Sequence, residues 1–165
     1  MSHDLDCFPP FAHDHDDCVR TAIDAAESQC ERRGARFTAL RRRVLELVWS
    51  SHEPVGAYAL LDILKAEGHG AAPPTVYRAL DFLIEQGLVH RLERLNAFVG
   101  CRHPESPHSA QFLICTRCGR IAELDDSAIG LAINKGAEAL GFAVVRQTIE
   151  VEGLCPDCRH GGART

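Results

Sequence analysis

Apolar residues recur every three or four positions through the first half of the chain, and this spacing predicts helices. In the last of these helices, Val76, Leu80, Leu83 and Ile84 form one stripe. Thr38 is a favourable N-cap residue for the second helix, and Pro73 and Gly87 fit the start and end of the fourth. The predicted helices span residues 18–33, the segment from Thr38 to about Ser50, residues 56–67 and residues 73–86.

Shorter apolar runs predict strands in the second half of the chain. Residues 88–92 and 97–101 flank a turn near Asn96 and predict a hairpin. Helices that lead directly into a hairpin are the pattern of a winged helix-turn-helix domain. Further on, the pattern predicts strands over residues 111–115, 120–124 and 143–151, and a helix over residues 126–140.

These elements predict the fold class α+β and a division of the chain into four parts. An N-terminal winged helix-turn-helix domain is followed by a small α/β unit, and the prolines, serines and histidines between them indicate a hinge. The predicted parts are an acidic, disordered tail over residues 1–17, the winged-helix domain over residues 18–101, the hinge over residues 102–110 and the α/β unit over residues 111–165.

Composition indicates an ordinary soluble protein. Of 165 residues, 45% are hydrophobic and 25% are charged, and no apolar run is long enough to span a membrane. The first residues lack the basic and apolar regions of a signal peptide. We therefore expect a cytoplasmic protein whose eight cysteines stay reduced.

The net charge of −5 is unevenly distributed along the chain. Residues 1–17 contain five aspartates and no lysine or arginine, so the acidic excess belongs to the predicted tail. Phosphate binding depends on a local basic patch more than on the net charge. Such a patch is one interpretation of a run of arginines, and a solvated helix face is the other. The run consists of Arg32, Arg33, Arg36, Arg41, Arg42 and Arg43.

Two CxxC motifs carry the clearest chemistry. Cys115 and Cys118 form the first pair, and Cys155 and Cys158 form the second. Four thiolates suit a tetrahedral zinc site, and Gly119 suits the tight turn that such a pair requires. A pair of disulfides and a thioredoxin-like redox motif are the alternatives, but disulfides belong to oxidising compartments and redox motifs occur singly after a strand. We predict a structural zinc site.

The predicted helix over residues 73–86 has a polar face opposite its apolar stripe. Arg78 lies nearly opposite the centre of the stripe, Thr75 shares that side, and Tyr77 flanks it. An arginine near the N-terminus of such a helix can donate two hydrogen bonds to a guanine edge in a major groove. The helix pattern alone fits a protein-binding helix equally well. The hairpin that follows it and the nearby arginines favour DNA.

The run Pro73-Pro74-Thr75-Val76-Tyr77-Arg78-Ala79-Leu80-Asp81-Phe82-Leu83, together with the paired CxxC motifs, resembles the ferric uptake regulator family, and most closely its zinc-sensing members. The resemblance extends from about Cys18 to Cys158. It implies a metal-activated homodimer that binds palindromic, double-stranded operator DNA and represses zinc-uptake genes. It also implies that the α/β unit is the dimerisation domain and that Arg36 and Tyr58 lie near DNA.

The same resemblance implies a regulatory zinc site formed by His90, Cys101, His108 and Glu123, and therefore two zinc ions per chain. One thiolate, two imidazoles and one carboxylate form a tetrahedral set suited to zinc, and a thiolate favours zinc over iron(II) or manganese(II). The His-His-Asp-His run of iron- and peroxide-sensing relatives is absent, because Ser109-Ala110-Gln111-Phe112 occupies that position.

Three alternatives remain open at this point. An iron or peroxide sensor of the same family would differ in metal selectivity, and Cys101 is the discriminating residue. A zinc scaffold that never reads DNA would show no metal-dependent DNA affinity. A zinc hydrolase would need an open coordination position and a base, but Glu123 is already the fourth ligand and no substrate motif is present. We therefore expect neither an enzyme nor a small-molecule substrate.

Overall fold

The computed structural model describes residues 15–50, 53–70, 72–105 and 110–161 of the chain. The described residues belong to two compact units, one ending at Glu105 and the other starting after it. We call residues 15–105 the winged-helix unit and residues 110–161 the sheet unit. None of the helices in the described ranges is long and apolar enough to cross a membrane.

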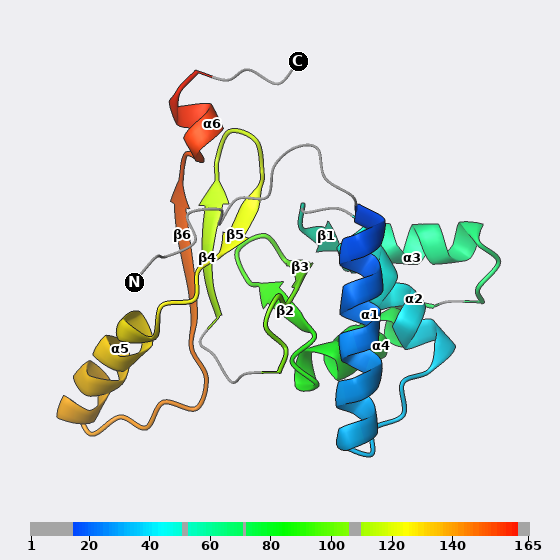
Figure 1. The fold of residues 1–165 in the computed structure, drawn as a ribbon, viewed down its shortest axis with the longest axis horizontal. Helices are drawn as coiled ribbons and strands as arrows, with labels where there is room; N and C mark the ends of the chain where they lie inside the picture. The colour runs from blue at the N-terminus through cyan, green and yellow to red at the C-terminus, as the bar shows by residue number, and fades with distance from the viewer. Residues whose placement is uncertain (1–14, 51–52, 71, 106–109, 162–165) are drawn as a thin grey trace. The chain divides into compact units, whose positions relative to one another are not determined.

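Four helices and a three-stranded antiparallel sheet make up the winged-helix unit (Figure 1). Helix α1 packs against α2, and α2 and α3 both pack against α4. The sheet has the order β1-β3-β2, in which Val55 pairs with Phe98 and His90 with Val99. The elements are α1 (His15–Arg32), α2 (Ala39–Trp49), β1 (Val55–Gly56), α3 (Ala57–Ala66), α4 (Pro73–Glu85), β2 (Val89–Leu92) and β3 (Ala97–Gly100).

The residues that predicted the helix ends lie at those ends in this unit. The side chain of Thr38 accepts a hydrogen bond from the Arg41 backbone N–H at 3.4 Å, which confirms it as the N-cap of α2. Gly87 follows α4 with a φ of +71°, a conformation that glycine adopts without steric cost. The apolar stripes meet in one core, whose fully buried members include Val44, Leu60, Leu64, Leu80 and Leu83.

The sheet unit contains three strands and two helices. Its elements are β4 (Ala110–Cys115), β5 (Ile121–Glu123), α5 (Ser127–Ala139), β6 (Thr148–Gly153) and the short α6 (Pro156–Arg159). Strand β4 lies at the centre of the sheet, antiparallel to β5 and parallel to β6 (Figure 1). Asp126 caps α5 by accepting a hydrogen bond from the Ala128 N–H at 2.9 Å. Phe112 is the largest fully buried side chain of this unit.

The structure confirms the predicted α+β fold class and changes several boundaries. Helix α1 begins at His15 rather than Cys18, since Asp16 and Asp17 lie in its first turn, where acidic side chains favour a helix N-terminus. The last strand begins at Thr148 rather than residue 143, and the Val145 side chain is 98% exposed. The short elements β1 and α6 were not predicted from the sequence, because neither is long enough to show a periodic pattern.

We predict that Gly100→Ala destabilises the winged-helix unit. A Cβ on this residue would lie 2.1 Å from Cε2 of the Trp49 indole, so the ring would have to move. Overpacking of this kind costs roughly 1–3 kcal/mol. Gly70→Ala is the matched control, because a Cβ there meets nothing within 4 Å. Urea unfolding of both variants checks the prediction, and equal stabilities would contradict the close contact with Trp49.

Candidate metal centres and nucleic-acid interface

The parallel pairing of β4 with β6 brings the two CxxC motifs to the same edge of the sheet. Cys115 is the last residue of β4 and pairs with Gly153, the last residue of β6. Parallel strands point in the same direction, so both motifs follow strand ends that lie side by side. The Thr116 N–H donates to the Gly153 carbonyl at 2.9 Å and continues the connection one residue beyond the strands.

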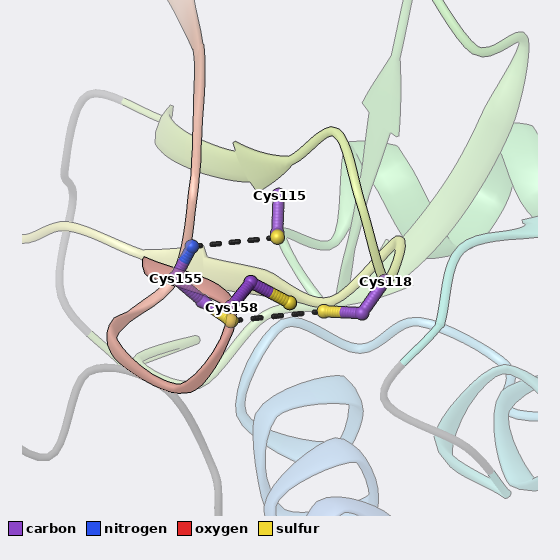
Figure 2. Close-up of side chains that lie close together, drawn as sticks. All are labelled: Cys115, Cys118, Cys155 and Cys158. Atoms are coloured by element: carbon purple, nitrogen blue, oxygen red, sulfur yellow. Dashed lines mark hydrogen bonds between the residues drawn. The ribbon is translucent and has the colours of Figure 1, made fainter. Parts of the chain in front are cut away.

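The four sulfur atoms of these motifs form one buried cluster (Figure 2). All four Sγ atoms lie within 4.8 Å of one another, and those of Cys118 and Cys155 are 3.7 Å apart. Four sulfurs at the usual zinc–sulfur distance of about 2.3 Å lie about 3.8 Å from each other in a tetrahedron. A disulfide needs about 2.05 Å between sulfurs, and all four cysteines are free. The donor set and its spacing therefore fit zinc.

Tight turns shape both CxxC motifs. In the first, Gly119 has a φ of +75°, as expected for this turn, and its N–H donates to the Cys115 carbonyl at 2.9 Å. In the second, Cys155 is the N-cap of α6, and its own N–H donates to the Cys115 Sγ at 3.3 Å (Figure 2). A sulfur that accepts N–H bonds is stabilised as a thiolate, the form that binds metal.

The pKa values of three cysteines in the cluster are shifted in different directions. Burial raises the pKa of the Cys115 thiol, but N–H donors from Cys155, Cys118 and Arg117 lower it by more, to about 6. Burial also raises the pKa of Cys155, and its N–H donors again outweigh that effect and lower it. Burial and the neighbouring cysteine side chains raise the pKa of Cys158 to about 12. A cation at this cluster would replace the proton that Cys158 otherwise keeps.

Two of the four predicted regulatory ligands lie together in the winged-helix unit. His90 is on β2, and Cys101 follows β3 directly, with its N–H bonded to the Leu88 carbonyl at 3.0 Å. A ring nitrogen of His90 and the Sγ of Cys101 lie within 4.8 Å of each other, and Cys101 is buried. Glu123 is the last residue of β5 in the sheet unit, and His108 lies outside the described residues.

The predicted DNA-contacting residues differ in exposure. Arg78 on α4 is exposed, Thr75 is half-buried, and Tyr77 is half-buried and packs against the core. Tyr58 at the start of α3 is 66% exposed, and Arg36, just before α2, is also exposed. Part of the Tyr77 ring therefore serves the fold, whereas Arg78, Tyr58 and Arg36 present their side chains to solvent.

The arginine run is largely used inside the winged-helix unit. Arg33 donates to the Gln86 carbonyl at 3.2 Å. Arg41 lies over the Phe82 ring at 3.5 Å, and Arg42 pairs with Glu27. Arg43 forms a two-point ion pair with Glu67 and also binds Glu46. These four arginines have partners within the unit, which account for part of the charge of the run, and a phosphate-binding role of the run stays a prediction.

We predict that Cys155→Ser lowers the zinc content of the purified protein by about one ion per chain. The change removes one thiolate from a buried site that requires four. Cys18→Ser is the control, because Cys18 is outside the cluster and only half-buried. Metal analysis after dialysis against a mild chelator checks the prediction. Equal zinc content in both variants and in the unmodified chain would exclude the four-cysteine cluster as the tight zinc site.

Comparison with known proteins places the chain in a family. The sequence model of the Ferric uptake regulator family matches residues 32–152. The zinc uptake regulation protein of Escherichia coli strain K12 is 41% identical over 134 residues, which are 81% of this chain and 78% of that protein.

Two solved structures are similar along most of the chain. A zinc uptake regulator in complex with zinc and DNA has a TM-score of 0.82 at 38% identity, over 86% of this chain and 95% of that one. Holo XcZur has a TM-score of 0.79 at 46% identity, over 86% of this chain and 99% of that one. With the family match over most of its length, this chain belongs to the Ferric uptake regulator family.

Proposed function

We propose that the chain is a zinc-responsive transcriptional regulator, whose zinc-loaded dimer binds palindromic operator DNA and represses zinc-uptake genes. The observation that carries this proposal is the similarity, over 86% of the chain, to a zinc uptake regulator solved with zinc and DNA. A regulator of this kind acts where the chromosome is, so we propose a cytoplasmic location. We propose two zinc ions per chain, one structural and one regulatory.

We propose that His90, Cys101, His108 and Glu123 bind the regulatory zinc. The short separation of the His90 ring nitrogen and the Cys101 sulfur supports the first two. Zinc prefers tetrahedral coordination by sulfur and nitrogen ligands, and the thiolate of Cys101 disfavours the harder iron(II) and manganese(II) ions. This donor set is what separates the proposal from an iron sensor or a peroxide sensor of the same family.

The proposed ligands supply a physical link between zinc and DNA. His90 and Cys101 belong to the winged-helix unit and Glu123 to the sheet unit, so one ion held by all of them would limit the relative positions that the units adopt. Zinc would then favour a conformation in which two recognition helices of a dimer match successive half-sites. By linkage, operator DNA must tighten zinc binding by the same factor.

We propose that α4 is the recognition helix, with Arg78, Thr75 and Tyr77 contributing to DNA contact and with Tyr58 and Arg36 nearby. The exposed position of Arg78, on a helix whose Val76, Ala79, Leu80 and Leu83 are buried, supports this role. Pro73 and Pro74 at the start of α4 have no backbone N–H, and the Thr75 and Val76 N–H groups both donate to the Ala72 carbonyl. We therefore propose that the DNA contacts of this helix come from its side chains.

The proposed homodimer has support in the surface of the sheet unit. Within α5 only Gly130 is buried, although the helix carries several apolar residues. Leu140 is 86% exposed and Phe142 66% exposed just beyond the helix. Apolar side chains left exposed by the fold of one chain can be covered by a second chain. The large exposed apolar residues of this unit are Leu131, Ile133, Leu140, Phe142, Val145, Val151 and Leu154.

Metal-buffered DNA binding tests the proposal. A fluorescent palindrome selected from a random pool is titrated with the protein at stepped free zinc and, separately, at stepped free iron(II). Activation by zinc alone is expected, because the regulatory set contains a thiolate. Activation at lower free iron(II) would move the function to iron sensing, and binding that ignores both metals would leave a zinc scaffold.

We predict that Cys101→Ser abolishes the zinc response of DNA binding while the structural zinc stays bound. The chain contains a single tryptophan, and its indole lies against Gly100, next to Cys101. Trp49 emission therefore reports on metal at Cys101 independently of DNA. Zinc should change this emission in the unmodified chain and in the Cys18→Ser control, but not in Cys101→Ser. A normal zinc response of the Cys101→Ser variant in both assays would disprove the sensory role of Cys101.

We predict that Arg78→Ala weakens specific operator binding by about 1–3 kcal/mol, the usual contribution of a bidentate arginine–guanine contact. The side chain is exposed, so the stability of the fold should not change. Arg20→Ala is the matched control, since it removes the same charge from an exposed site on α1. Binding titrations at fixed salt against specific and random DNA check this. Equal losses in both variants, or on both DNAs, would indicate a general charge effect.

A further inference from the structure

A buried arginine adjoins the four-sulfur cluster and is absent from the predicted site residues. The Arg120 side chain is only 7% exposed. Its Nη2 donates to the Cys155 Sγ at 3.1 Å and also forms an ion pair with the Asp157 carboxylate. Arginine is almost never this buried unless it is paired. Both of these partners belong to the second CxxC motif, whereas Arg120 follows the first and also hydrogen-bonds Cys118 of that motif.

The net negative charge of a four-thiolate zinc site accounts for a buried cation beside it. Four thiolates around one Zn²⁺ carry a net charge of −2, which is costly to hold inside a protein without a nearby cation. Among the described residues, Arg120 is the cation with a hydrogen bond to one of these sulfurs. A charge-assisted hydrogen bond from a guanidinium to a thiolate stabilises the ionised form of the sulfur that binds metal.

The position of Arg120 also connects the two halves of the site. The first CxxC motif is held by the turn after β4, and the second by the start of α6. Nη2 of the Arg120 guanidinium donates to both Cys155 and Asp157 and so fixes the second motif against the first. A set of ligands that such contacts hold in place binds a metal more tightly than a loose one.

We propose that Arg120 is a positioning residue that stabilises the Cys155 thiolate, holds the two CxxC motifs together and thereby sets how tightly the structural site retains its metal. This inference rests on the proposed structural zinc site. Loss of an outer partner of this kind typically lowers metal affinity by about 10- to 100-fold. Arg117 supplies a matched comparison, because its side chain is also next to the cluster but donates to the Cys158 backbone carbonyl, at 2.7 Å. Its hydrogen bond to the Cys115 sulfur comes from the backbone N–H, which a side-chain substitution keeps.

The test uses the full-length chain with Cys101→Ser, so that the only proposed metal site left is the four-cysteine one. The protein is loaded with Co²⁺, whose thiolate charge-transfer bands report directly on the bound sulfurs. In Arg120→Met, we expect these bands to move to longer wavelength, because a sulfur without the hydrogen bond gives up electron density more readily. A competing chelator should remove the metal about 10- to 100-fold more easily. Arg117→Met removes a contact between the motifs but no hydrogen bond to a sulfur, so its charge-transfer bands should match those of the parent.

The outcomes separate this inference from the site that it depends on. If the parent shows no four-thiolate cobalt spectrum, the structural site itself is wrong. If the parent shows that spectrum and Arg120→Met has the same bands and the same chelator resistance, the role of Arg120 is overturned. Should Arg120→Met fail to fold, Arg120→Lys tests the proposal instead, since lysine keeps the positive charge but replaces the planar guanidinium with a compact ammonium group. Intermediate retention with a partial band shift is expected, and behaviour identical to the parent overturns the proposal.

Discussion

A four-thiolate site requires four sulfurs to converge although 36 residues separate Cys118 from Cys155. The parallel pairing of β4 with β6 meets this requirement, because it ends both strands at the same edge, with Cys115 opposite Gly153. The register is decisive, since a slip of one residue reverses the face to which each side chain points. A metal at this edge would in turn fix the register. Strand pairing and metal binding therefore stabilise the same arrangement, which matters in a unit with a small apolar core.

Local signals were sufficient for much of the fold. The helical stripes, the Thr38 cap and the turn at Gly119 depend on neighbours within a few residues, and the structure contains all of them. The start of β6 at Thr148 depends instead on where β4, 38 positions earlier in the register, offers a partner. Val144 and Val145 are strand-forming residues but pair with none of the described strands, so the apolar run alone gave a longer strand than the structure has.

The candidate sites also contain some features that local sequence predicts and others that depend on partners distant in the sequence. Cysteine spacing alone predicted that four cysteines form one site, and the structure places their sulfurs within 4.8 Å of one another. The four are Cys115, Cys118, Cys155 and Cys158. The roles of the arginines could not be deduced in this way. Arg43 meets Glu67 across helices α2 and α3, and Arg120 meets Asp157 across the sheet unit, so each role is set by a partner distant in sequence. A count of basic residues therefore does not show which arginines are paired within the fold.

The two proposed zinc sites differ in ways that suit opposite tasks. The four-cysteine site is buried, all its ligands are thiolates, and N–H groups and Arg120 donate to its sulfurs. Such a closed site holds its metal and resists exchange. At Cys101 the N–H bonds the Leu88 carbonyl and so belongs to the strand pairing, and the proposed ligand set has one sulfur beside nitrogen and oxygen. Fewer thiolates weaken the hold on zinc, and a sensor must release its ion when the free concentration falls. On this proposal, the same metal would be a permanent structural link where four sulfurs bind it and a signal where one does.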